Sequence, residues 1–117
     1  MSTIWTPSGE HQPHEEPEIE QELRQARAEL AAVPVADIIA NHAIGLWQLA
    51  MLHLTPDPTP DGTPVPPRLA EAGLAIDALG ALVDTLGDRL EPHADTLREA
   101  VTQLRLAYVQ LGAHRDA

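Results

Sequence analysis

The chain has 117 residues, the size of one small domain, and its hydrophobic content of 44% is enough to build a core. Its formal net charge is −11 and all seven cationic residues are arginine, so we expect no direct binding to nucleic acid, whose phosphates repel an acidic surface. The chain has no cysteine, which excludes disulfides, thiolate catalysis and cysteine-ligated zinc and is typical of a cytoplasmic protein.

The first part of the chain combines a polar tail with one amphipathic segment. Residues 1–16 mix proline, glycine, glutamine and acidic residues without periodicity, which predicts a disordered acidic tail and no signal peptide. In residues 17–33 five apolar side chains recur at helical spacing and predict an amphipathic helix. They are Ile19, Leu23, Ala26, Leu30 and Val33. This stripe is thin, so we expect the helix to need a surface on which to dock, and Pro34 ends it.

Residues 35–54 predict the central helix of the fold. At steps of 100° one apolar arc is formed by Ile39, Ala43, Leu46, Trp47, Ala50 and Leu54. A helix this apolar is a core element, a membrane span or an interface. Its apolar run of roughly 17 residues is shorter than the ~20 that cross a bilayer, and two histidines, an asparagine and a glutamine interrupt it. We therefore expect a buried or interfacial helix and no membrane span.

The opposite arc of residues 35–54 is the candidate interface. It interleaves apolar side chains with uncharged polar ones and a glycine: Ile38, Asn41, Gly45, Gln48, Leu49 and Leu52. A bare surface of this kind is prone to association. Two covers are open to it, the 17–33 helix of the same chain or a second copy of the chain. We favour self-association as a homodimer, with a foreign protein partner as the other reading.

Residues 55–67 hold six prolines and an Asp61–Gly62 step, so they predict a stiff loop between two helices. The only acidic residues in this loop are Asp57 and Asp61. They lack the ligand spacing of a calcium loop, and we expect no metal site there.

Residues 68–90 carry the most regular pattern, a heptad seam of alternating three- and four-residue steps. Its members are Leu69, Ala72, Ile76, Leu79, Val83, Leu86 and Leu90. Beside the seam, Gly73, Gly80 and Gly87 recur every seven residues. Each glycine costs about 1 kcal/mol relative to alanine inside a helix. Three such costs on one stripe predict a packing role, a bare backbone strip that lets a neighbouring helix come close.

Residues 92–111 repeat the heptad spacing and predict a last helix, with Gly112 as its stop. The second seam consists of Ala94, Leu97, Val101, Leu104, Tyr108 and Leu111. The short break at Glu91 and Pro92 makes the two heptad helices an antiparallel hairpin. The predicted fold is therefore all-α. A helical domain of residues 35–112 has a three-helix core, made of one apolar helix and the hairpin, and an additional amphipathic helix precedes it.

Four groups of residues, taken in order and spacing, carry a family resemblance. They are Leu49, Leu52, His53 and Leu54; Asp57, Pro58 and Gly62; Ala75, Ile76, Asp77, Leu79 and Leu82; and Leu104, Arg105, Leu106, Tyr108 and Val109. Over about residues 35–111 the chain resembles the bacterial domain-of-unknown-function family 1844. It departs from that family in the proline-rich entry to the 68–90 helix, residues 64–67, and in its lack of lysine. The resemblance implies a helical fold and no established activity. It also implies that the gene is similar to one that lies near a translation initiation factor gene, and hence a link of the protein to translation.

No stretch of the sequence holds a catalytic or cofactor constellation, so we expect no enzyme, no bound cofactor and no metal. His42 and His53 share one helix face but lie about 16 Å apart by helical rise, too far to chelate one ion. The sequence favours a small cytoplasmic module for protein interaction or assembly. The alternatives are an accessory subunit of an enzyme and a membrane-associated helical protein.

Overall fold

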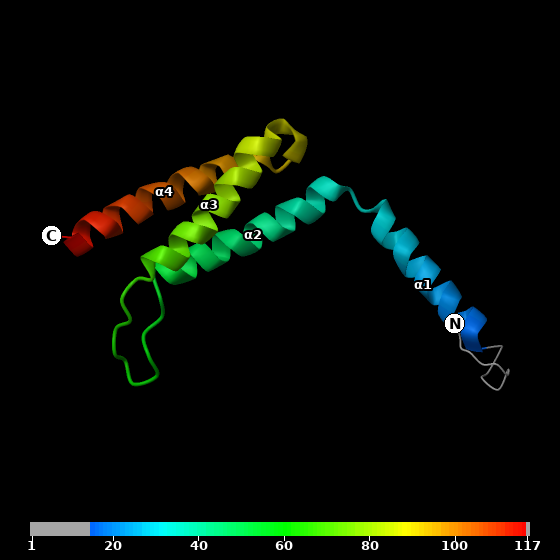
Figure 1. Cartoon of the computed structure of the whole chain (residues 1–117), viewed down its shortest axis with the longest axis horizontal. Coiled ribbons are helices and arrows are strands. Elements are labelled where there is room, and N and C mark those ends of the chain that lie inside the picture. Colours follow the sequence, from blue (N-terminus) through cyan, green and yellow to red (C-terminus); the bar gives the residue numbers. More distant parts are fainter. Residues whose placement is uncertain (1–14, 117) are drawn as a thin grey trace. The chain divides into compact units, whose positions relative to one another are not determined.

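A computed structural model gives the fold of the chain and describes residues 15–116 (Figure 1). These residues form four α-helices and one short 3-10 helix, and no strand occurs among them. The helices are α1 (Glu15–Ala32), α2 (Val35–Leu54), α3 (Leu69–Leu86), η1 (Gly87–Leu90) and α4 (Ala94–Asp116). The prediction of an all-α fold is confirmed. The chain divides into two compact units, Met1–Pro34 and Val35–Ala117.

The first unit contains α1, which begins at Glu15, two residues before the predicted start. Pro17 lies in the first turn, where its missing N–H breaks no helical hydrogen bond. At the other end the amide of Val33 donates to the carbonyl of Leu30 at 3.1 Å, and Pro34 prevents another turn. Apart from Glu15 and Glu16, the predicted disordered tail lies outside the described residues.

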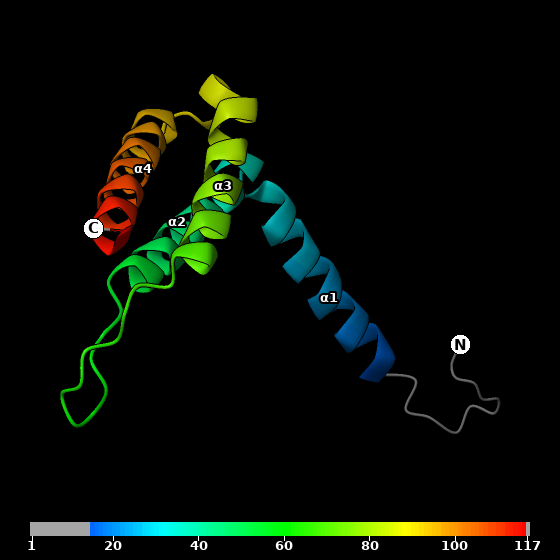
Figure 2. The same cartoon turned by 60° about the vertical axis from the view of Figure 1, so that its left-hand side comes forward.

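The second unit is a three-helix bundle. Helices α2, α3 and α4 each contact the other two, and consecutive helices run antiparallel, as Figures 1 and 2 both show. The hairpin of α3 and α4 is therefore present as predicted, and α2 lies against both of its members. The heptad seams explain this arrangement, because each turns one continuous apolar stripe toward the other helices.

The core of the bundle is built from leucine, alanine and a few β-branched side chains. Five leucines are fully buried: Leu54, Leu79, Leu90, Leu97 and Leu104. On α2 the buried positions are otherwise alanines, with Ala43 and Ala50 wholly inaccessible. Small side chains on α2 allow α3 and α4 to approach it closely, which offsets the absence of phenylalanine from the sequence.

The end of α3 differs from the prediction of one helix over residues 68–90. The α-helix ends at Leu86, and Gly87 has a φ of +51° while its amide donates to the carbonyl of Val83. The chain then turns through η1, where Leu90 is still buried. Gly87 therefore lies at the end of the α-helix and not inside it, with a positive φ that favours glycine, and a Cβ there would lie 3.5 Å from Nη2 of Arg98 on α4.

The last helix also differs from the prediction at both ends. It begins at Ala94, after a turn in which the amide of His93 donates to the carbonyl of Leu90 at 2.8 Å. It continues through Gly112 to Asp116. Gly112 was predicted to stop the helix, but it does not share the positive φ of Gly62 and Gly87, so the helical hydrogen bonds continue past it.

The proline-rich segment between α2 and α3 forms a loop without helix or strand, drawn in green in Figure 1. The amide of Arg68 donates to the carbonyl of His53 at 2.8 Å and closes the base of this loop. At its tip Thr59 and Thr63 are joined backbone to backbone at 2.9 Å around Asp61 and Gly62. The loop thus holds the C-terminus of α2 beside the N-terminus of α3.

Candidate interaction surface

The side of α2 that points away from the bundle core is apolar and open to solvent. We call it the outer face of α2 and define it by Ile38, Asn41, Ile44, Gly45, Gln48, Leu49, Met51 and Leu52. Leu49, Met51 and Leu52 are each 49% exposed and Ile44 is 40% exposed. Between Asp37 and Asp57 the sequence carries no aspartate, glutamate, lysine or arginine. Four large apolar side chains therefore lie on a surface with no formal charge among them.

The geometry of one helix places these residues outward. Ala40, Ala43, Ala50 and Leu54 point into the core, and at 100° per residue the outer face falls on the other side. All six predicted interface residues lie on this outer face, either exposed or half-buried. Ile44 and Met51 were not predicted to belong to it. Their positions, seven residues apart, lie at the edge where the outer face meets the core side.

The apolar surface continues from α2 onto α3. A shallow hollow is bordered by Leu46, Leu49 and His53 of α2 and by Glu71, Leu74, Ala75 and Ala78 of α3, so one carboxylate lies at its edge. Leu74 is 68% exposed, more than Ile44, Leu49, Met51 or Leu52 of α2. The sequence pattern did not single out Leu74, because it lies beside the regular seam of its helix. The resulting apolar strip spans α2 and α3.

By length and composition, α2 is also apolar enough to cross a membrane, alone among the described helices. The central helix of a water-soluble bundle meets the same criterion. In this bundle one side of α2 packs on α3 and α4.

Gly73 and Gly80 lie on the side of α3 that faces α4. A methyl group at Gly73 would lie 3.3 Å from Cε2 of Tyr108, and one at Gly80 would overlap the guanidinium of Arg105. Beside this contact lies a hollow of about 330 Å³ between α3 and α4. It is bordered by Gly73, Ile76, Asp77, Arg105, Tyr108 and Val109. These two glycines therefore leave room for side chains of α4 against the backbone of α3.

A polar contact that the sequence did not reveal joins two elements at one end of the bundle. Nε2 of His93 lies 2.9 Å from Oδ1 of Asp37, and the two residues are 56 positions apart. It links the first turn of α2 to the turn before α4. Both side chains are partly exposed, so the contact contributes at most about 1 kcal/mol. No local spacing predicts a pair so distant in the chain.

A second polar cluster fastens the turn between α3 and α4. Nη2 of Arg98 donates to Asp88 at 2.9 Å and Nη1 donates to Asp95 at 3.1 Å. The hydrogen bond with Asp88 is the main reason why the pKa of Arg98 is raised above its ordinary value. Both carboxylates are largely solvated, so this cluster orients the turn and is no enclosed site.

The described residues contain no group of three histidine, aspartate or glutamate side chains placed to hold a metal ion. His42 is exposed on α2, and His53 is half-buried near the C-terminal end of the same helix. The structure therefore does not bring these two predicted face-sharing histidines together with a further ligand.

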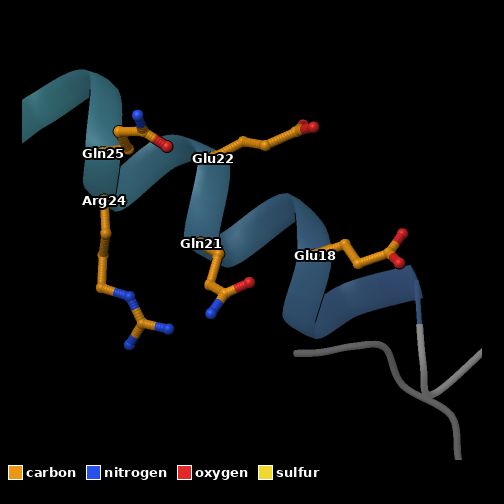
Figure 3. Close-up of a pocket in the computed structure, with 5 residues that line it drawn as sticks. All are labelled: Glu18, Gln21, Glu22, Arg24 and Gln25. Carbon is orange, nitrogen blue, oxygen red and sulfur yellow. The ribbon is translucent and has the colours of Figure 1, made fainter.

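On α1 a wide, open depression is bordered by Glu18, Gln21, Glu22, Arg24 and Gln25. Figure 3 shows that all five belong to one helix, with Glu18 and Glu22 pointing to one side and Arg24 away from them. A surface made by a single helix cannot enclose a small ligand. It is relevant as a helix face that another protein can contact.

No family model, no curated protein and no solved structure matches the chain. The resemblance to the domain-of-unknown-function family therefore stays a prediction.

Proposed function

We propose that the chain is a non-enzymatic protein-interaction module that forms a homodimer through the outer face of α2. The observation that carries this proposal is the outward position of Leu49 and Leu52, each 49% exposed, with Ile44 and Met51 exposed at one edge of the same face and no formal charge among the four. Covering the exposed half of such a side chain contributes roughly 1 kcal/mol. A second copy supplies the same surface, so Leu49 and Leu52 of each copy contribute together.

The centre of the outer face suits a close contact between two helices. Gly45 has no atom within 4 Å of the position where a Cβ would lie, so the backbone of α2 is accessible there. In a contact with two-fold symmetry, Gly45 of one copy lies near the same region of the other. Asn41 and Gln48 are exposed on either side of it and carry amides that both donate and accept. Each amide is able to pair with an amide of the second copy and so avoid an unsatisfied buried group.

The substitution Leu49→Asp tests this proposal. A carboxylate at the centre of the apolar contact would be buried without a partner, so we expect the variant to be a monomer at concentrations where the natural chain is a dimer. Native mass spectrometry and sedimentation velocity measure the difference, and far-UV circular dichroism reports whether the helices are retained.

Val109→Asp is the matched control. Val109 is 64% exposed on α4 and receives the same charge, but it lies outside the outer face of α2. We expect this variant to remain a dimer. A helical Leu49→Asp variant that keeps the dimer mass would refute the proposed interface, and so would equal loss of the dimer in both variants.

The membrane-associated alternative rests on the length and apolar composition of α2. It requires the outer face to contact lipid in place of a second copy. Flotation of the full chain with phosphatidylcholine vesicles separates the two functions: the module we propose stays at the bottom of the gradient, whereas a membrane-associated protein rises with the vesicles.

A further inference from the structure

Helix α1 carries a second apolar surface, separate in sequence from the outer face of α2. Ile19 is 53% exposed, Leu23 is 58% exposed and Leu30 is 63% exposed. With Ala26 they form a stripe at steps of four, three and four residues. That spacing is the pattern by which an amphipathic helix places its anchors in a groove of another protein. We call these four residues the α1 stripe.

A row of carboxylates lies along one side of the α1 stripe. Glu18, Glu22 and Glu29 are spaced by four and seven residues, so they line up on the helix surface at roughly 20–40° from one another. Figure 3 shows Glu18 and Glu22 directed to the same side. The other side of the stripe is mixed, with Glu20 and Arg27. The charge of this helix surface is therefore one-sided.

This one-sided charge disfavours pairing between two copies of α1. In an antiparallel pair, Glu22 of one copy would face Glu29 of the other on the same flank, and like charges there repel. In a parallel pair the favourable contact of Glu22 with Arg27 extends over one heptad only, which is too short to hold two helices together.

We infer that α1 docks its stripe into an apolar groove of a different protein, and that arginine or lysine lines the side of this groove that faces Glu18, Glu22 and Glu29. Charge complementarity sets the chemistry of the partner: the stripe requires an apolar floor, and the glutamate row requires a basic rim on one side. The inference goes beyond the homodimer, because it gives each copy a separate element that binds another protein.

Two synthetic helical peptides serve as probes. Both carry leucines at the seam positions of three heptads; one has arginine at the flanking positions and the other has glutamate. We expect the full-length protein to bind the arginine peptide in fluorescence anisotropy, and to bind it more weakly as salt is raised, because exposed charges are screened. We expect no measurable binding of the glutamate peptide.

Variants of the full chain locate the binding. Leu23→Asp should weaken it by more than about tenfold, as expected for a central apolar anchor. Glu22→Gln with Glu29→Gln should weaken it roughly 2- to 30-fold, the range expected for two exposed ion pairs. The matched control, Glu20→Gln on the other flank, should change it less than about twofold.

A charge reversal provides the strongest comparison. The variant with Glu22→Arg and Glu29→Arg should exchange the preference and bind the glutamate peptide. Leu49→Asp should leave binding of the arginine peptide intact, so failure of the homodimer and failure of this inference are distinguishable.

Four results would overturn the inference. The first is the absence of binding to the arginine peptide, and the second is an unchanged preference after charge reversal. The third is a loss of dimer mass in Leu23→Asp, which would identify a second copy as the occupant of the stripe. The last is a lower unfolding midpoint of the α2–α4 bundle in Leu23→Asp, which would identify α1 as docking on its own chain.

Discussion

Gly45 and Gly87 both lie in segments that the sequence predicts to be helical, yet they adopt different backbone conformations. Gly45 is inside α2 with open space around its missing Cβ, whereas Gly87 ends α3 with a φ of +51°. The first conformation is accessible to any residue and the second favours glycine. The same substitution to alanine should therefore have opposite effects at the two positions.

We predict that Gly45→Ala raises the free energy of unfolding by about 0.5–1 kcal/mol, because alanine is the better helix former. Gly87→Ala should lower it by about 1–2 kcal/mol through backbone strain. Urea unfolding measures both, in the Leu49→Asp background so that association adds nothing to the stability. A destabilising Gly45→Ala or a neutral Gly87→Ala would contradict these conformations.

Asp61 is the residue whose titration tests the loop between α2 and α3. Its carboxylate accepts hydrogen bonds from the hydroxyls of Thr59 and Thr63 and from the amide of Thr63. The bond from Thr59 is the main cause that lowers the pKa of Asp61. Because hydrogen bonding stabilises the charged form, the turn is fully stabilised above the unfolded pKa of ~3.9 and loses this contribution as pH falls through the lower folded pKa.

We predict that the carboxyl carbon of Asp61 titrates in an NMR experiment with a pKa below the ordinary value of an aspartate side chain. The substitution Thr59→Val should move the pKa of Asp61 upward. A midpoint at the ordinary aspartate value in the natural chain would show that these hydrogen bonds are absent in solution.

The sequence predicted the structural roles of some of these residues and missed those of others. The spacing of Gly73, Gly80 and Gly87 is perfectly regular, and a Cβ at each would lie near a side chain of α4, but the third glycine also ends its helix with a positive φ. The regular spacing of glycines in a sequence does not reveal whether φ is positive or negative at each of them, since glycine adopts both signs. The contact of His93 with Asp37 was missed for a different reason: it depends on how two helix ends meet in space.

At the scale of helices the sequence was more informative, because heptad spacing follows directly from helical geometry. The predicted seam residues Ala72, Ile76, Leu79 and Val83 are buried, and α2 has the predicted bounds of residues 35–54. The ends of the hairpin helices were predicted less well. Helix α3 stops four residues early and α4 passes Gly112, because stop signals act only where the local backbone adopts the stopping conformation.

The same comparison holds for the candidate surface. The outward position of Leu49 and Leu52 was predicted from the rotation of α2 about its axis. The continuation onto Leu74 was not, because it requires knowing which side of α3 lies beside α2. Faces of one element are therefore readable from sequence, whereas surfaces shared by two elements need the fold.

The α2–α4 bundle should be stable without α1. Every buried core residue lies between Ala40 and Leu104, within the second unit. We predict that residues 35–117 alone unfold cooperatively with the same Tm as the full chain, as measured by circular dichroism. A Tm lower by about 4 °C or more, equivalent to roughly 1 kcal/mol for a unit of this size, would mean that residues 1–34 contribute to the bundle.

At the scale of the whole molecule, we propose two surfaces with two separate tasks. In this proposal the outer face of α2 joins two copies, and the α1 stripe of each copy binds a basic-rimmed groove of another protein. A dimer presents two such helices, so a partner with two grooves would bind with a higher effective concentration than a monomer allows. The central claim on which this arrangement depends is the homodimer.

Sedimentation equilibrium of the full natural chain over a range of micromolar concentrations tests that claim most directly. We predict a species with twice the mass of the chain that dissociates on dilution without loss of helix content. A single species with the mass of one chain at every concentration would contradict it, and the outer face of α2 would then need another cover.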